Sequence, residues 1–209
     1  MRLTIVAALF VSLVASQDVS LAAVKRAFDS ANIPANANIK FEPTVLFELT
    51  FPQTSGLAIQ AHAGVQLPRN ATAGPPKFAI RNAVPTTRPF VVAAVDLDAP
   101  TPQNPTSAQI RHFLGGDFHL VPTRGTNTEP LVNSTAAVSE FRQPTPPAGS
   151  DPHRYVFLLF NQPAGFDQQT IVTPATSIAN FNISQFAEEV GLGNPIGGTF
   201  ILVGPDPTA

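Results

Sequence analysis

The chain has 209 residues, of which 44% are hydrophobic and only 12% charged, with 22 prolines, 13 glycines and no cysteine. This apolar content is too high for a disordered chain, and the many prolines and glycines favour short strands joined by loops. The net charge is −2, and the absence of a basic run or a basic amphipathic helix argues against a nucleic-acid or anionic-membrane partner. The length suits one domain with a core that needs no disulfide.

The first 16 residues have the pattern of a secretory signal peptide. Arg2 precedes an apolar stretch from Leu3 to Val14, which small residues follow. This stretch is too short to cross a bilayer as an anchor, and no transmembrane segment is expected. We therefore expect a signal peptide over residues 1–16 and a single domain over residues 17–209. The protein would be secreted to the extracellular space or, alternatively, delivered to an acidic lumen such as a vacuole.

The next part of the chain predicts a helix followed by a strand. Apolar residues recur at helical spacing from Asp18 to Ala31, with Asp18 or Ser20 as a suitable N-cap, and Pro34 should end this helix. Residues 41–51 alternate as in a half-buried strand, with one apolar face made of Val45, Phe47, Leu49 and Phe51.

The remaining pattern indicates short strands separated by loops rich in proline and polar residues. Strands are expected in pieces over residues 57–67 and over residues 78–80, 90–95, 112–120, 153–160 and 199–203. Loops are expected over residues 70–76, 101–107, 122–130 and 143–152, and a short helix over residues 182–191. This order predicts a mainly β domain with a few peripheral helices.

The apolar run over residues 90–95 ends abruptly in two carboxylates, Asp96 and Asp98, before Pro100. Consecutive apolar residues bounded by turn formers predict a strand buried on both faces. Because side chains alternate along a strand, Asp96 and Asp98 should point the same way. Two like charges at a buried strand end need cations or hydrogen-bond donors nearby.

Two later stretches can supply these partners. His153 and Tyr155 fall on one face of their strand and Arg154 on the other, and a buried arginine needs a carboxylate, for which Asp98 is the candidate. A carboxylate beside an imidazole favours the cationic imidazole. A pocket for a small anion, above all phosphate, would then be formed by Asp96, His112, His153 and Tyr155. The alternative is that both histidines are structural.

Catalysis and metal binding have weaker support. The sequence has no paired-histidine motif with ligand spacing, so no metal and no cofactor are expected. It has no cysteine and no Gly-x-Ser-x-Gly elbow, and a Ser-His-Asp set cannot be nominated without geometry. We therefore expect no enzymatic activity, with a hydrolase that uses the His-Asp pair as general base as an alternative.

Three Asn-x-Ser/Thr triplets are candidates for N-glycosylation behind a signal peptide, at Asn70, Asn133 and Asn182. Asn70 and Asn133 lie in polar stretches and are the stronger candidates. Asn182 also suits the N-cap of its predicted helix.

Three motifs resemble those of the phosphatidylethanolamine-binding protein family. Residues 96–100 (Asp-Leu-Asp-Ala-Pro) resemble its Asp-Pro-Asp-Ala-Pro signature, and residues 111–114 (Arg-His-Phe-Leu) its His-His-Phe segment. Residues 146–147 followed by 152–157 resemble its Pro-Pro and His-Arg-Tyr block. The order and separations agree, and the similarity covers most of the mature chain.

The resemblance implies a large antiparallel sheet packed against a smaller one. It also implies a pocket for phosphate-type anions or for phospholipid headgroups such as phosphatidylethanolamine, in a protein that is not an enzyme. By the same resemblance the pocket is lined by Asp96, Pro100, His112, Pro146, His153 and Tyr155, and is supported by an ion pair of Asp98 with Arg154. A serine carboxypeptidase as protein partner, inhibited through the same scaffold, is the alternative function.

The sequence departs from the family pattern at the pocket. Ile110 replaces an aromatic residue, Arg111 replaces the first histidine, and Thr145 stands where glycine often precedes the two prolines. We expect these changes to alter the pocket wall and its rim.

Overall fold

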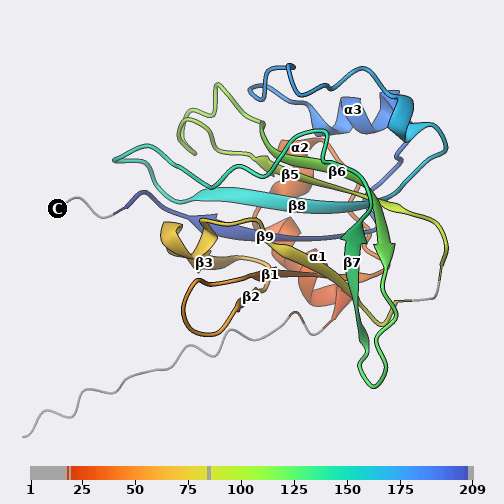
Figure 1. The fold of residues 1–209 in the computed structure, drawn as a ribbon. Helices are drawn as coiled ribbons and strands as arrows, with labels where there is room; N and C mark the ends of the chain where they lie inside the picture. The colour runs from red at the N-terminus through yellow and green to blue at the C-terminus, as the bar shows by residue number, and fades with distance from the viewer. Residues whose placement is uncertain (1–17, 19, 84–85, 207–209) are drawn as a thin grey trace, which may run out of the picture.

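The computed structural model describes residues 18, 20–83 and 86–206, so the expected signal peptide lies outside the described residues. Nine strands form one hydrogen-bonded sheet in the order β2-β1-β4-β7-β6-β5-β8-β9-β3 (Figure 1). The strands are β1 (Leu46–Phe51), β2 (Ile59–Ala61), β3 (Val65–Leu67), β4 (Lys77–Arg81), β5 (Phe90–Asp96), β6 (Ile110–Leu120), β7 (Thr128–Asn133), β8 (His153–Asn161) and β9 (Gly197–Val203). The helices are α1 (Leu21–Ser30), α2 (Ile33–Ala37) and α3 (Ile183–Glu189), with 3-10 turns η1 (Arg69–Thr72) and η2 (Phe166–Gln168).

The sheet curls so that its two parts face each other. The part containing β1 and β4 packs onto the part containing β8 and β9, and Phe47, Leu49, Phe157 and Ile201 belong to one buried cluster between them. The mainly β fold is confirmed. The expected large and small sheets are two parts of one continuous sheet, joined where β6 pairs with β7. Every strand pair is antiparallel except β3 with β9, which is parallel.

The helices cover the outer face of the larger part of the sheet (Figure 1). Phe28 of α1 stacks on Phe41 with ring centroids 3.9 Å apart, beside Phe200 of β9. In β5, Val91 and Val95 face this helical layer, whereas Val92 and Ala94 face the interior of the curl. The expectation of a strand buried on both faces is therefore confirmed, and β5 ends at a buried carboxylate, Asp96.

One expectation about proline is wrong, and one expected loop is shorter than predicted. Pro34 does not end the first helix: α1 is capped by Ala31, and Pro34 lies in the first turn of α2, where a missing N–H leaves no bond unmade. The polar loop expected over residues 122–130 is present but ends earlier, because β7 begins at Thr128 and contains Pro130. The Pro130 carbonyl accepts a hydrogen bond from the Val121 N–H, so the strand keeps its acceptor although it lacks a donor there.

Of the two N-cap candidates for α1, Ser20 is the one that caps the helix. Ser20 caps α1 by accepting from the Ala23 N–H, whereas the Asp18 carboxylate accepts from the Ala63 N–H. Within residues 18, 20–83 and 86–206, no helix is long and apolar enough to cross a membrane.

Candidate anion-binding site

A cavity of about 500 Å³ opens at the corner of the sheet where β5 ends and β6 and β8 begin. Asp96, Pro100, His112, His153 and Tyr155, all expected from the sequence, are among the residues that line it. The antiparallel register explains why they meet, because Asp96 pairs with both Ile110 of β6 and Tyr155 of β8. Residues more than 50 positions apart in sequence are therefore neighbours at one corner of the sheet.

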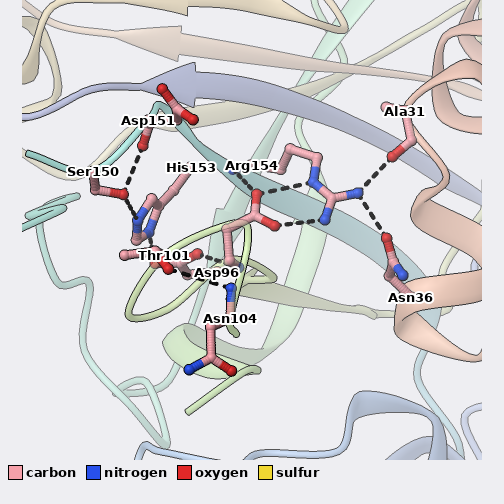
Figure 2. A network of polar contacts seen from close by, with 10 residues as sticks. Ala31, Asn36, Asp96, Thr101, Asn104, Ser150, Asp151, His153 and Arg154 are labelled. Carbon is pink, nitrogen blue, oxygen red and sulfur yellow. Dashed lines mark hydrogen bonds and ion pairs between the residues drawn. The ribbon is translucent and has the colours of Figure 1, made fainter. Parts of the chain in front are cut away.

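Asp96 is the hub of this corner (Figure 2). Asp96 is 3% exposed. One oxygen of its carboxylate lies 2.9 Å from His153 Nδ1, and the other accepts a hydrogen bond from the Asp98 N–H at 2.8 Å. Burial raises the pKa of the Tyr155 hydroxyl, and the Asp96 charge raises it further. Tyr155 is therefore a neutral hydroxyl in the pocket.

Asp98 serves the opposite side of the sheet, so the expectation that both carboxylates point the same way is wrong. The strand ends at Asp96, and the chain turns before Asp98. The Asp98 carboxylate accepts from the Arg154 backbone N–H, from Nε at 2.9 Å and from Nη2 at 2.5 Å. Arg154 Nη1 also donates to the Ala31 carbonyl and to the Asn36 side chain, as Figure 2 shows. The expected Asp98–Arg154 ion pair is present and outside the cavity lining.

His112 reaches the cavity through an irregularity in β6. The register between β5 and β6 shifts there, because Ala94 pairs with Phe113 and Val95 with Arg111, which leaves His112 as an extra residue. Such a bulge re-aims side chains locally. His112 Nδ1 lies 2.8 Å from the Arg142 carbonyl oxygen, which can only accept, so Nδ1 carries the proton. Nε2 has no hydrogen-bond partner among the described residues.

The two histidines differ in the nitrogen that they offer. His153 is 1% exposed and has both ring nitrogens engaged, Nδ1 with Asp96 and Nε2 with the Ser150 hydroxyl at 2.9 Å (Figure 2). Burial lowers the pKa of His112, an effect that its contact with the Arg142 carbonyl and the Asp96 charge partly offset. His112 is therefore the histidine with a nitrogen free for a ligand.

Pro146 does not line the cavity, contrary to expectation. It is buried, and the flanking residues Thr145 and Pro147 line the cavity instead. In the Pro-Pro pair only the second ring faces the cavity. Sequence analysis also did not name several lining residues, among them Arg142 and Ile178. No local motif marks either one, since each is placed by a backbone hydrogen bond to β6.

Arg111 shapes the wall behind the cavity. It is fully buried, its guanidinium carbon lies 5.1 Å from the centre of the Phe181 ring, and no carboxylate pairs with it among the described residues. Its Nη2 and Nη1 donate to the carbonyls of Thr176 and Ser177, and its backbone N–H donates to the Ile178 carbonyl. One arginine thus holds three successive carbonyls, and Ile178 is part of the cavity lining. Burial, followed by the charge of Arg142, lowers the Arg111 pKa.

The three glycosylation candidates all lie on the surface. Asn70 is in η1 and Asn133 ends β7, and both are exposed. Asn182 caps α3 by accepting from the Gln185 N–H at 3.0 Å, as the sequence suggested. In the part of the chain that the structure describes, no three histidine, aspartate or glutamate side chains gather as they would around a metal ion.

The chain is similar in sequence to two curated proteins over part of its length. Protein FLOWERING LOCUS T of Arabidopsis thaliana is 34% identical over 111 residues, which cover 53% of this chain and 55% of the relative. The carboxypeptidase Y inhibitor of Saccharomyces cerevisiae is 33% identical over 87 residues, 37% of this chain and 40% of the relative. The chain thus spans about half the length, or less, of these curated relatives.

The fold has a solved counterpart. The structure of carboxypeptidase Y inhibitor complexed with the cognate proteinase matches with a TM-score of 0.75 at 22% identity, covering 89% of this chain and 97% of that chain. The family model of the phosphatidylethanolamine-binding proteins matches residues 54–201, which is well over half of the sequence and includes all three motifs. The chain therefore belongs to the phosphatidylethanolamine-binding protein family.

Proposed function

We propose that this protein binds phosphate-bearing small molecules or phospholipid headgroups, such as that of phosphatidylethanolamine, in the cavity beside His112. The observation that carries the proposal is His112 itself, whose Nδ1 is fixed on a carbonyl so that Nε2 is left for a ligand. Arg142 is exposed and lines the same cavity. An imidazolium and a guanidinium at one cavity suit a phosphate, which accepts charge-assisted hydrogen bonds.

The negative charge of Asp96 is already answered by protein donors. His153 Nδ1 and the Asp98 N–H both contact its carboxylate, so an incoming anion meets a carboxylate that is hydrogen-bonded and buried. Behind the wall, Arg111 adds a positive charge that no carboxylate in the described residues neutralises. The local balance around the cavity therefore favours an anionic ligand.

The affinity should depend on pH. Neutral His112 presents a lone pair at Nε2, which repels an anion, whereas protonated His112 presents an N–H donor. Because burial lowers the His112 pKa, the free protein holds this imidazole neutral at neutral pH, and binding should strengthen as the pH falls. A bound phosphate in turn raises the pKa of His112.

The test is an NMR titration of the histidine rings with phosphorylethanolamine at about pH 5 and about pH 7.5, on either side of the ordinary histidine pKa of about 6.5. We expect His112 to shift most and binding to be tighter at the lower pH, with His62 as an internal control outside the cavity. A saturating titration that leaves His112 unmoved at both pH values would sink the proposal.

Inhibition of a serine carboxypeptidase is the second candidate function. The favouring observation is the similarity to the carboxypeptidase Y inhibitor, in sequence over part of the chain and in fold over most of it. Steady-state inhibition of carboxypeptidase Y by the purified chain tests it. Inhibition that persists in His112→Gln would place the inhibitory surface away from the cavity, and no inhibition at micromolar protein would reject this candidate.

Secretion and glycosylation complete the proposal. The signal-peptide pattern over residues 1–16 and the exposure of Asn70 and Asn133 support them. Expression of the full chain in a eukaryotic host, followed by N-terminal sequencing of protein from the medium, should find a start at residue 16 or 17. Retention inside the cell with residue 1 or 2 at the N-terminus would contradict it.

A further inference from the structure

Ser150, His153 and Asp96 form a continuous chain of two hydrogen bonds. The Ser150 hydroxyl oxygen lies 2.9 Å from His153 Nε2, and His153 Nδ1 lies 2.9 Å from Asp96 Oδ2 (Figure 2). Serine hydrolases of unrelated folds contain the same hydrogen-bonded chain of nucleophile, base and orienting carboxylate. In these enzymes the set is recognised by its geometry and not by its order in the sequence. The sequence alone could not nominate a Ser-His-Asp set, because such a set is recognised by its geometry.

The protonation states follow from what each atom can do. The Asp96 carboxylate accepts, so in neutral His153 the proton is on Nδ1 and the lone pair is on Nε2. That lone pair faces the Ser150 hydroxyl, which is the arrangement of a general base next to its nucleophile. Asp96 is itself fixed by the Asp98 N–H, so the imidazole cannot easily turn away.

A second acceptor competes for the serine proton. The Ser150 hydroxyl also lies 2.9 Å from the Asp151 carbonyl oxygen, and one hydroxyl has one hydrogen to donate. Asp151 is exposed, so solvent can satisfy its carbonyl when the hydroxyl turns to His153. The competing contact therefore leaves the base accessible.

Ser150 is also placed where a substrate can reach it. The residue is half-buried, on the loop that contributes Thr145 and Pro147 to the anion cavity, and its partner His153 lines that cavity. Ser150 is not itself part of the cavity lining, and its hydroxyl is linked to the cavity through His153. The buried members of the set are the base and the carboxylate, as they are in a relay that excludes water from its proton transfer.

We propose that Ser150 is a nucleophile that His153 and Asp96 activate, and that the protein accepts acyl groups from small carboxylic esters. Ser150 Oγ bonds to the acyl carbon while its proton moves to His153 Nε2. The bond to the leaving alcohol breaks, and the alcohol takes that proton. Water then attacks the acyl carbon, gives a proton through Nε2 to Ser150 Oγ, and releases the carboxylic acid. This activity departs from the expectation that the protein is not an enzyme.

The test uses a fluorophosphonate probe on the full-length protein, read by peptide mass spectrometry. Ser150 Oγ would displace fluoride and carry the phosphonate, and hydrolysis of p-nitrophenyl acetate would be inhibited in proportion. We expect labelling at Ser150 in preference to the other serines of the same chain. Ser184→Ala is the matched control, because Ser184 is half-buried and its contact in the structure is with Asn38 and not with a histidine.

Ser150→Ala should abolish the label and the esterase activity. Asp96→Asn should reduce the labelling rate by about 10⁴-fold, because the amide would leave the base His153 in the wrong tautomer. Equal labelling of many serines in the wild-type chain would overturn the proposal, and so would Ser150 labelling that Asp96→Asn leaves unchanged. The wild-type comparison decides even if a variant fails to fold. Phosphorylethanolamine should still bind Ser150→Ala, so failure here is separate from failure of the anion site.

Discussion

Asp96 and Asp98, two residues apart, stand in very different surroundings. The Asp98 carboxylate is fully engaged within the protein, because it accepts three hydrogen bonds from Arg154. Arg154 also donates to the Ala31 carbonyl at the end of α1 and to the Asn36 side chain. Asp96 opens through His153 onto a cavity of about 500 Å³. Through Arg154, Asp98 connects the helical layer to the sheet, whereas Asp96 fixes the tautomer of His153. Two carboxylates only two residues apart can therefore stabilise the fold on one face of the sheet and orient a cavity-lining histidine on the other.

The largest expected effect comes from breaking the Asp98–Arg154 ion pair. Asp98→Asn leaves Arg154 without its charge partner in a buried setting, and we expect a loss of about 3 kcal/mol or more in unfolding free energy. Urea denaturation measures it. Asp96→Asn is the matched control and should cost less, about 1 to 2 kcal/mol, since it removes a charge-assisted hydrogen bond but strands no guanidinium. Equal losses in the two variants would contradict the division of roles.

Arg111→Lys tests whether the Arg111 guanidinium holds residues 176–178 at the wall of the cavity. Lysine keeps the charge but cannot reach the Thr176 and Ser177 carbonyls together, so we expect a stability loss of about 1 to 2 kcal/mol. Backbone amides of residues 176–178 should exchange hydrogen faster, and phosphorylethanolamine should bind several-fold more weakly. Hydrogen-exchange mass spectrometry and calorimetry read the two effects. Unchanged exchange at residues 176–178 would refute the positioning role.

The pH dependence of stability sharpens the contrast. Because burial lowers the His112 pKa, the unfolded chain takes up this proton first, and His112 stabilises the fold only above the ordinary histidine pKa of about 6.5. Stability should fall as the pH drops through that value towards the lower, folded-state pKa. The denaturation midpoint measured from pH 7.5 to 5 should fall less in His112→Gln. Added phosphate should restore part of the loss in the wild type, and an identical pH profile in both proteins would be the contrary result.

The smallest effect is expected at the periphery of the Asp98–Arg154 ion pair. Asn36→Ala removes one acceptor from Arg154 Nη1, which keeps the Ala31 carbonyl, so we expect a loss of about 0.5 kcal/mol. Thermal unfolding measures it. A loss as large as that of Asp98→Asn would mean that Asn36, and not the carboxylate, secures the arginine.

Strand positions were predictable where the pattern is local and strong. β5 and β8 follow from their apolar runs, and the buried face of β1 follows from alternation. The capping of α3 by Asn182 follows from the preference of asparagine for N-cap positions. β7 was missed because a strand that contains Pro130 has no such pattern, and its pairing with β4 and β6 overrides the local preference. The direction of the Asp98 side chain was missed because the prediction assumed that the strand continues to residue 98. β5 ends at Asp96, so side-chain alternation does not apply to Asp98.

The sequence by itself determined that an apolar strand runs into the carboxylate Asp96, with a second carboxylate two residues later. It also determined that His153 and Arg154 face opposite sides of one strand, since side-chain alternation is a local property of the backbone. Tertiary structure decided which carboxylate each of them meets, because that depends on strand register and on the turn after Asp96. It also decided that His112 enters the cavity through a bulge and that Ser150 lies against His153. Loop paths and register shifts arise from packing between distant segments, and no local pattern records them.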